Sequence, residues 1–506
     1  MKKIFSIFLA LLLLTFQTPQ FVLANDALLT WQDDGIPKEP IYNELTGEFE
    51  IYTPNQLAWI AYKTNSTTES SDLNGWSFSI MNDIDLSGRE WIPIKNFSGT
   101  INGNNRTLRN LYLNSDENYS GLFASLSSAT VSDLTLSDVS IISDSLYVGS
   151  LSGYANSSLI SNVKSDGSVS GNSYTGGLVG KCNATNITLS SFNGNVVGID
   201  KVGGLVGCYE DTYCRYLVTY MKQCFSSGKV NGNQYVGGLV GSKYYTGIQD
   251  CYSLSDVSGN SVIGGLVGIV VNTNNNYQIV VSISSIMTQN TYSFGNVSGN
   301  SYVGGVFGGG VDGLGLNYWN INSTHKVANV ELDMFSKSGA GCYSTNDKKL
   351  TITQMKDKNN FSSFDFDDIW NIDPEMNNGL PYLRNYNYDD LEQSTDYTIK
   401  ELYVSDIYGE KIGNGTTIPK INKFCVNVSI TKNAATAEKG YLFIATYTDA
   451  GQLIDFNIMS GTYYQNQEIT FISTINNPDG KIGKIKAFVW DSLTSLTPLS
   501  NSLCID

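Results

Sequence analysis

The chain has 506 residues, of which 31 are basic and 47 acidic, giving a formal net charge of −16. Charged residues make up only 15% of it, which excludes a coiled coil, and a hydrophobic content of 41% argues against disorder. The negative charge disfavours nucleic acid as a partner, whereas 49 glycines and 31 tyrosines favour short strands joined by tight turns.

The first 24 residues have the pattern of a secretory signal peptide. A positively charged start precedes an apolar run over residues 4–16, and the small residues Val22 and Ala24 indicate cleavage before Asn25. The apolar run is too short to span a membrane, and no later run is long enough. An uncleaved anchor is the alternative. The sequence therefore predicts an extracellular protein, secreted or held at the cell surface, with no transmembrane segment after cleavage.

A glycine-rich repeat occupies the middle of the chain. Four segments read Gly-Gly-Leu-Val-Gly, with looser copies on either side, and their leucines lie 27 residues apart except where insertions lengthen the unit. Polar and apolar residues alternate between the copies, which is typical of strands. The second glycine and the leucine of each copy mark the repeat: Gly177, Leu178, Gly204, Leu205, Gly238, Leu239, Gly265 and Leu266.

A unit of 27 residues cannot bury a core alone, so the units are expected to stack as the coils of a parallel β-solenoid. Equivalent residues would then lie above one another, one strand spacing apart. We expect the repeated glycines to supply the positive φ angles that coil corners need. A phosphate-binding loop is disfavoured because no helical pattern follows any copy.

The repeat resembles the GLUG-motif family of secreted bacterial β-solenoid proteins, which are adhesin-like. The resemblance covers roughly residues 49–386 and includes opening segments at 51–57, 82–86 and 90–94 and closing segments at 365–372 and 378–383. It implies a right-handed solenoid of about ten coils. We expect an N-terminal cap and first coils over 25–120, repeat coils over 121–320, and a closing coil and cap over 321–388.

The pattern changes after residue 388. Residues 389–396 are polar and are predicted to be a linker, and residues 397–506 contain six or seven short strand patterns separated by turn residues. This spacing is typical of an Ig-like β-sandwich. The last strand is similar to that of a small domain that closes many secreted proteins of Gram-positive bacteria. The expected fold class is therefore all-β: a solenoid followed by a sandwich.

A tyrosine recurs once in several of the units, and two insertions interrupt the repeat near residues 209–222 and 272–285. Exposed aromatic rings can bind sugars or apolar groups of a partner, and insertions often lie on a binding face. The alternatives are a tyrosine ladder that only packs coil on coil and loops that vary without consequence. The candidate binding residues are Tyr147, Tyr174, Tyr235 and Tyr302.

All eight cysteines follow the predicted signal, and no CxxC pair occurs among them. Cys208 and Cys214 lie in the first insertion and are the candidate disulfide, because a loop can adjust its geometry. Cys224 and Cys251 occupy equivalent positions in adjacent units and form either a bridge or two buried thiols. With one histidine in the chain, no metal site and no cofactor are expected.

Catalytic patterns are weak. His325 lies in a polar stretch and is expected to be exposed, and paired carboxylates at Asp83 and Asp85 or around Asp365 fit turns better than acid–base catalysis. The sequence thus favours a non-catalytic, monomeric, adhesin-like protein that binds an extracellular protein or glycan. A β-helix polysaccharide lyase or glycosidase and a purely structural envelope protein are the alternatives.

Overall fold

The computed structural model describes the solenoid and the C-terminal sheets but leaves the predicted signal peptide and linker undescribed. The described residues are 29–505 apart from 34, 67–72, 213–218, 272–286, 311–314, 333–337, 339–346, 375, 385, 387–396, 407, 409, 413–416, 433–437, 449–452, 464–467, 478–479 and 491–502.

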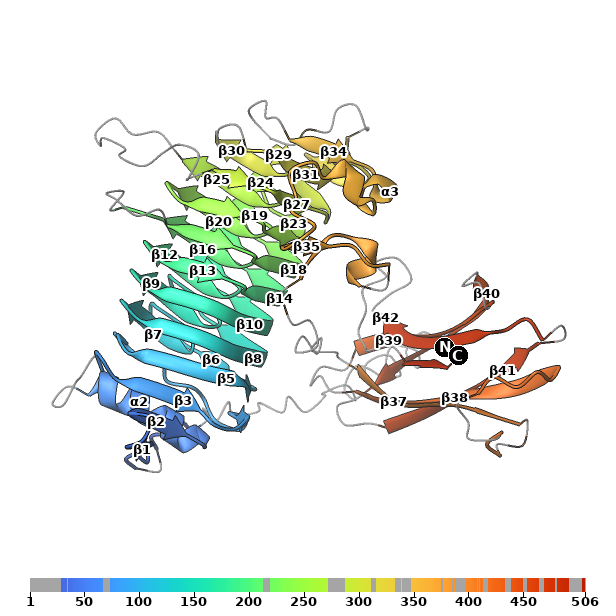
Figure 1. Ribbon diagram of the computed structural model, residues 1–506, viewed down its shortest axis with the longest axis horizontal. Helices are drawn as coiled ribbons and strands as arrows, with labels where there is room; N and C mark the ends of the chain where they lie inside the picture. Colours follow the sequence, from blue (N-terminus) through green and yellow to red (C-terminus); the bar gives the residue numbers. More distant parts are fainter. Residues whose placement is uncertain are drawn as a thin grey trace, which may run out of the picture.

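Short parallel strands stack into a β-solenoid of about nine turns, which confirms the predicted architecture of the repeat region (Figure 1). Each turn in the middle of the solenoid contributes strands to three sheets. Val169 pairs with Val196, and Val179 pairs with Val206, so the 27-residue unit of the sequence equals one coil. Nearly every residue of a coil therefore lies above its equivalent in the coil before.

Sheet 1 has 22 strands, and most of its pairs are parallel. Its strands are β1 (Ile41–Asn43), β2 (Glu48–Ile51), β3 (Ser77–Ile80), β4 (Ile84–Asp85), β5 (Thr100–Arg109), β6 (Tyr112–Asn114), β8 (Thr130–Ile142), β10 (Leu159–Ser170), β13 (Asn186–Thr188), β14 (Ser191–Val197), β17 (Tyr220–Lys222), β18 (Phe225–Asn231), β21 (Gly247–Gln249), β22 (Tyr252–Ser253), β23 (Asp256–Ser258), β26 (Thr288–Gln289), β27 (Thr291–Ser293), β28 (Val297–Gly299), β31 (Asn317–Asn320), β32 (His325–Val327), β33 (Val330–Glu331) and β34 (Lys348–Leu350).

Sheets 2 and 3 are shorter and entirely parallel. Sheet 2 consists of β7 (Phe123–Ser127), β9 (Ser152–Asn156), β12 (Val179–Asn183), β16 (Val206–Glu210), β20 (Val240–Tyr244), β25 (Val267–Val271) and β30 (Phe307–Gly310). Sheet 3 consists of β11 (Ser173–Gly176), β15 (Asp200–Gly203), β19 (Gln234–Gly237), β24 (Ser261–Gly264) and β29 (Ser301–Gly304).

The glycine-rich motif forms the bend between sheets 3 and 2. Its leucines point into the core, where Leu178, Leu205, Leu239 and Leu266 are each fully buried. A Cβ added at Gly204 would lie 2.0 Å from the carbonyl oxygen of Gly238 in the next coil. The equivalent distances at Gly177, Gly238 and Gly265 are 2.1–2.2 Å. None of these four glycines has a positive φ, and they are needed because the coils approach closely. The expected positive φ occurs instead at Gly167, Gly194 and Gly228, which also recur once per coil.

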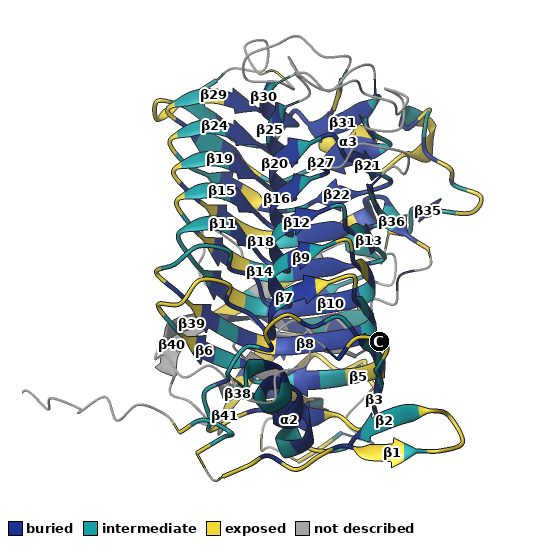
Figure 2. Ribbon diagram, turned by 90° about the vertical axis from the view of Figure 1, so that its left-hand side faces the viewer, coloured by how far each residue is buried: buried dark blue, intermediate teal, exposed yellow. Residues whose placement is uncertain are grey.

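A helix that the sequence analysis did not predict closes the N-terminal end of the solenoid (Figure 2). Helix α2 (Pro54–Asn65) begins after Thr53, whose hydroxyl accepts a hydrogen bond from the amide of Gln56. The Thr-Pro-Asn-Gln run is the signal that could have revealed it, because proline suits the first helical position and Thr-x-x-Gln caps a helix. The helix buries an apolar face against the first coils, including Leu57, Ile60 and Ala61.

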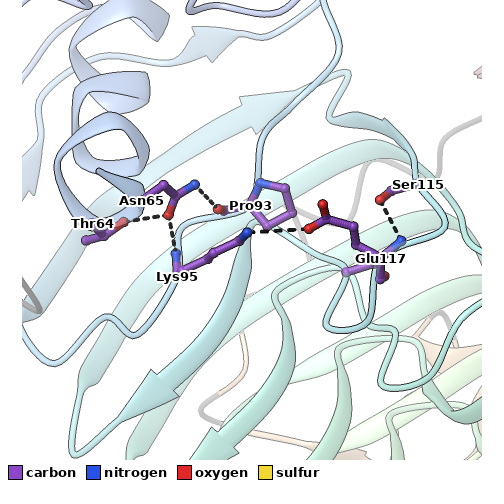
Figure 3. A network of polar contacts seen from close by, with 7 residues as sticks. Thr64, Asn65, Pro93, Lys95, Ser115 and Glu117 are labelled. Carbon is purple, nitrogen blue, oxygen red and sulfur yellow. Dashed lines mark hydrogen bonds and ion pairs between the residues drawn. The ribbon is translucent and has the colours of Figure 1, made fainter. Parts of the chain in front are cut away.

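The C-terminal end of α2 is fixed to the loops of the first coils by polar contacts (Figure 3). The side chain of Asn65 donates to the carbonyl of Pro93 over 2.9 Å and accepts from the amide of Lys95 over 3.0 Å. Lys95 also forms an ion pair with Glu117 at 3.4 Å, but both side chains are well exposed. The amide contacts therefore hold the helix more firmly than the ion pair does.

The segment after the last coil folds back along the outer side of sheet 1 (Figure 1). It contains α3 (Ile352–Met355), the 3-10 helices η2 (Lys358–Asn360) and η3 (Asn377–Gly379), and the paired strands β35 (Trp370–Asn371) and β36 (Tyr382–Leu383). Its apolar side chains cover a column of stacked rings formed by Phe225, Tyr252 and Tyr292, with Tyr318 next in register.

The C-terminal strands form two antiparallel sheets. One contains β37 (Tyr397–Ser405), β38 (Lys423–Lys432) and β41 (Glu468–Asn476). The other contains β39 (Glu438–Tyr447), β40 (Leu453–Tyr463), β42 (Lys484–Trp490) and β43 (Leu503–Ile505). Residues of both sheets, such as Val428 and Ile444, belong to one buried cluster that is distinct from the solenoid core.

Candidate binding face

The four tyrosines predicted as binding residues lie on a corner of the coil at sheet 3. Tyr174, Tyr235 and Tyr302 are the second residues of β11, β19 and β29, and Tyr147 directly precedes the bridge between Val148 and Thr175. Their backbones are left-handed, with φ between 54° and 66°. The equivalent positions in the other coils are Tyr119, Lys201 and Val262, which also have positive φ. Residues with side chains rarely adopt this conformation, and asparagine, aspartate and glycine adopt it most easily. The chain therefore places an aromatic residue repeatedly at a backbone position that disfavours one.

Only part of this column forms a stack. The ring centroids of Tyr119 and Tyr147 are 4.9 Å apart, and those of Tyr147 and Tyr174 are 4.8 Å apart, with interplanar angles of 6° and 16°. Tyr235 lies in register between Lys201 and Val262, and Tyr302 follows Val262. The stack therefore does not run through all four predicted tyrosines, because lysine and valine interrupt the column.

Tyr119 was missed by the sequence analysis. Its strand bridge at Ser120 pairs with Val148, which places Tyr119 directly below Tyr147. In the regular units the tyrosine precedes the marker leucine by four residues, whereas Tyr119 precedes Leu122 by three. The first copy therefore lacks one residue of the glycine-rich bend. Aligning the tyrosines rather than the leucines would have found it.

Charged side chains meet the upper end of the stack. The ammonium of Lys201 donates to the hydroxyl of Tyr174 over 3.2 Å and lies 4.5 Å from the centroid of that ring. Lys181, on sheet 2, forms an ion pair of 3.0 Å with Glu210. Tyr154, also on sheet 2, packs at a tilt against the two lower rings. We name the tyrosine face by these seven residues: Tyr119, Tyr147, Tyr154, Tyr174, Lys181, Lys201 and Glu210.

The tyrosine face is accessible but partly desolvated. Tyr119 is 40% exposed, and the other six side chains are of intermediate exposure. Burial raises the pKa of Tyr147 above its ordinary value, so its phenol stays protonated at neutral pH. Burial alone would lower the pKa of Lys181, but the hydrogen bond and charge of Glu210 outweigh it and raise that pKa. The face thus presents phenol hydroxyls, two ammonium groups and a carboxylate in fixed positions.

The predicted Cys208–Cys214 disulfide is not supported. Cys208 is a free cysteine, fully buried on β16 in register with Lys181 and Ser242, and Cys214 lies outside the described residues. Burial raises the pKa of Cys208 to about 12, which leaves its thiol protonated and unreactive. Cys224 and Cys251 are also buried and free, in adjacent coils, with the amide of Cys224 3.4 Å from the sulfur of Cys251. For that pair the two-thiol alternative holds.

The residues weighed for catalysis have structural roles. His325 is buried, contrary to the expectation of an exposed loop, because its ring packs edge-on against Trp319 and one ring nitrogen lies 3.0 Å from the carbonyl oxygen of Val303. Asp83 accepts a hydrogen bond from the amide of Thr107.

The other candidate carboxylates close turns. Asp85 accepts from the amide of Ser87 at 2.9 Å, and Asp365 accepts from the amides of Asp367 and Asp368, both at 3.0 Å. Such contacts are those of side chains that replace backbone partners in a turn. The acid pairs singled out in the sequence thus serve the coil bends.

Two other kinds of site are absent from the described residues, namely a metal centre and a membrane-crossing helix. Among these residues, no group of three or more histidine, cysteine, aspartate or glutamate side chains is placed to hold a metal ion. No helix within the described ranges has the length and apolar character needed to cross a membrane.

Comparison with known proteins gives distant structural likenesses only. No protein-family model matches the chain, and no curated protein matches it. A solved structure of an IgA1 protease aligns with 54% of this chain and 22% of its own, at 19% identity and a TM-score of 0.37. The enzymatically active domain of tailspike protein 4 of bacteriophage CBA120 aligns with 84% of this chain and 62% of its own, at 10% identity and a TM-score of 0.13. Similarity at this level carries no argument about function.

Proposed function

We propose that the chain is a secreted or cell-surface, adhesin-like binding protein without catalytic activity, and that its solenoid presents the tyrosine face to an extracellular protein or glycan. The resemblance to the GLUG-motif family and the signal-peptide pattern support the extracellular part of this proposal. We also propose that the solenoid is right-handed, as the family resemblance implies. We further propose that the two C-terminal sheets form an Ig-like sandwich, since residues of both sheets belong to one buried cluster.

The observation that carries the proposal is the difference between the two aromatic columns. Phe225, Tyr252 and Tyr292 also stack along the solenoid, but the closing segment covers them, and they are buried. The column of Tyr119, Tyr147 and Tyr174 keeps part of its surface exposed. An accessible row of aromatic side chains with charged groups at its end is typical of a recognition surface.

The backbone strain at the same corner supports this interpretation. A left-handed conformation costs a residue with a side chain about 1–2 kcal/mol. Elsewhere the solenoid often has asparagine or aspartate at left-handed positions, for example Asn104 and Asp138, although Leu189 and Gln223 also adopt this conformation. Stacking between the rings offsets some of the cost for Tyr147 and Tyr174. Recognition of a ligand is a further reason for tyrosine at this corner.

The enzyme alternative has less support, because the candidate carboxylates are engaged by backbone amides in turns. In a purely structural protein, the tyrosines would only stack on one another and would contact no ligand. The binding test must therefore compare a tyrosine inside the stack with one outside it.

The test is binding of the mature chain, residues 25–506, to panels of extracellular proteins and glycans. We expect saturable binding that falls at least tenfold in Tyr147→Asn. Tyr302→Asn has the same left-handed backbone outside the tyrosine face and serves as the matched control, with binding unchanged. Thermal melting would verify that both variants are folded. Equal loss in both variants would refute the tyrosine face as the site, and cleavage of a bound glycan would refute the non-catalytic assignment.

A further inference from the structure

We infer that the tyrosine face binds an uncharged glycan chain that lies along the solenoid axis. This inference rests on the proposed function and narrows its ligand to one chemical class. Three observations lead to it: the balance of charge on the face, its hydrogen-bonding groups, and the direction in which those groups repeat.

The charges of the tyrosine face cancel locally. Lys181 is paired with Glu210 at 3.0 Å, and Lys201 is adjacent in sequence to Asp200, with which it interacts electrostatically. Two cations thus accompany two carboxylates. An anionic ligand gains no net attraction from such a face, and the whole chain, with a charge of −16, repels it. A cationic protein likewise gains no net attraction from this face, although acidic surface elsewhere on the chain attracts it.

The hydrogen-bonding groups suit ligands rich in hydroxyls. A hydroxyl both donates and accepts, so it needs donors and acceptors together. Lys201 and Lys181 supply donors, Glu210 supplies an acceptor, and the phenols of the stack supply both. The tyrosine rings add apolar edges, and Tyr119 at the lower end is the most exposed ring of the stack, at 40%. Sugars present a polar rim and apolar C–H groups, which matches this combination.

The repeat direction favours a polymer. Ring centroids follow one another at 4.8–4.9 Å along the solenoid axis, because equivalent residues stack one strand spacing apart. A chain of repeating units that lies along this axis can contact the phenol groups of all three stacked tyrosines, whereas a single sugar can contact only one or two. Extended solenoid surfaces are suited to such elongated ligands. We therefore expect affinity to rise with the length of the glycan.

The experiment uses the mature chain and an array of neutral oligosaccharides, built from hexoses or N-acetylhexosamines, beside matched chains that carry carboxylate or sulfate groups. A set of cationic proteins is included as a third arm. We expect binding to at least one neutral chain, stronger for longer chains, and changed less than about twofold between about 50 mM and about 500 mM salt, because an uncharged ligand makes no charge–charge contact for salt to screen.

Two conservative variants test the residues. Lys201→Gln and Glu210→Gln are each expected to weaken binding to the neutral chain about tenfold or more, since a hydrogen bond to a charged group is lost. Lys229→Gln changes an exposed lysine on the outer side of β18 and is the control, with binding unchanged. Equal melting temperatures would exclude loss of fold as the cause.

The outcomes distinguish this inference from the proposed function. Binding only to acidic chains, or binding that falls steeply with salt, overturns the inference and leaves a glycan-binding protein. Binding only to a cationic protein also overturns it while the proposed function stands. Absence of binding in every arm overturns both.

Discussion

Tyr147 shows how one residue can serve the fold and a binding face together. Its backbone is left-handed, with a φ of 66°, and its ring lies between those of Tyr119 and Tyr174. Each stacked pair contributes about 0.5–1.5 kcal/mol beyond simple burial. The two contacts thus offset a backbone cost of about 1–2 kcal/mol, which explains why a strained tyrosine can persist at this corner.

Replacing stacked and unstacked tyrosines at the same backbone position should therefore have different effects. We expect Tyr147→Asn to lower the free energy of unfolding by about 1–2 kcal/mol, because the two stacked pairs and the partial burial of the ring are lost together, which outweighs the strain relieved. Tyr235→Asn, between Lys201 and Val262, should change it by less than about 1 kcal/mol. Urea unfolding of both variants measures the difference. Equal effects would show that stacking does not stabilise the corner.

Asp166 links stability to pH. It is 98% buried on β10 and accepts a hydrogen bond of 2.8 Å from the amide of Asp138. Burial raises its pKa from 3.8 to about 7, and the charge of Asp138 adds to this effect. The folded chain therefore holds this proton more tightly than the unfolded chain does. Its contribution to stability is fully present below about pH 4 and is lost as the pH rises through about 7.

Asp166→Asn should remove this dependence. Asparagine keeps an oxygen that can accept from Asp138 but never carries the buried charge. At pH 8 we expect the variant to be more stable than the parent by up to a few kcal/mol, on the order that a shift of this size implies. Below pH 4 the difference should largely disappear. Unfolding free energies measured from about pH 3 to about pH 8 test this, and parallel curves for the two proteins would contradict it.

At the scale of elements, the glycine-rich bend decides how closely the coils can approach. The second glycine of each copy faces the carbonyl of its equivalent in the next coil at a distance that leaves no room for a methyl group. The leucine that follows fills the core. One short motif therefore sets both the bend and the spacing of the coils, which explains why it recurs almost unchanged along the repeat.

Gly204→Ala should be severely destabilising. Its Cβ would lie 2.0 Å from the carbonyl oxygen of Gly238, and both atoms belong to the packed backbone of adjacent coils. We expect a loss of about 3 kcal/mol or more, if the variant folds at all. Gly88→Ala is the control, because its φ of 78° is unfavourable for alanine but nothing lies within 4 Å; it should cost about 1 kcal/mol. Thermal melting compares the two, and similar losses would argue against the collision.

At the scale of the whole molecule, two separate buried clusters support separate folding units. The solenoid core runs from Ile51 to Ile321 in one continuous cluster, and the C-terminal sheets have their own, from Ile399 to Ile505. A repeat array gains stability from contacts between neighbouring coils, whereas a pair of small sheets depends on one local core. The two parts should therefore respond differently to heat.

Calorimetry of the mature chain should resolve more than one unfolding transition. Val428→Ala removes two methyl groups from the buried core of the C-terminal sheets. It should lower the transition of that part, at a cost of about 1–3 kcal/mol, and leave the solenoid transition in place. A single transition that shifts as a whole would show that the two parts unfold together.

Local patterns were enough to predict the coil. The spacing of the glycine-rich copies determines a 27-residue unit, and the alternation of apolar residues determines strands, because a repeated unit buries its core only by stacking on its neighbours. The recurring tyrosines were visible for the same reason. Helix α2 also had a local signal in its capping residues, although the sequence analysis did not use it.

The candidate face depended on relations that no local pattern contains. Whether a tyrosine stacks is set by the residues above and below it, so Lys201 and Val262 break the column that the repeat suggested. The meeting of Lys181, Lys201, Tyr174 and Glu210 joins two sheets and two coils. The closing segment covers the aromatic column on sheet 1 and leaves the tyrosine face uncovered, because it returns along sheet 1. These contacts arise only when the coils are in register, and so the tertiary structure decided them.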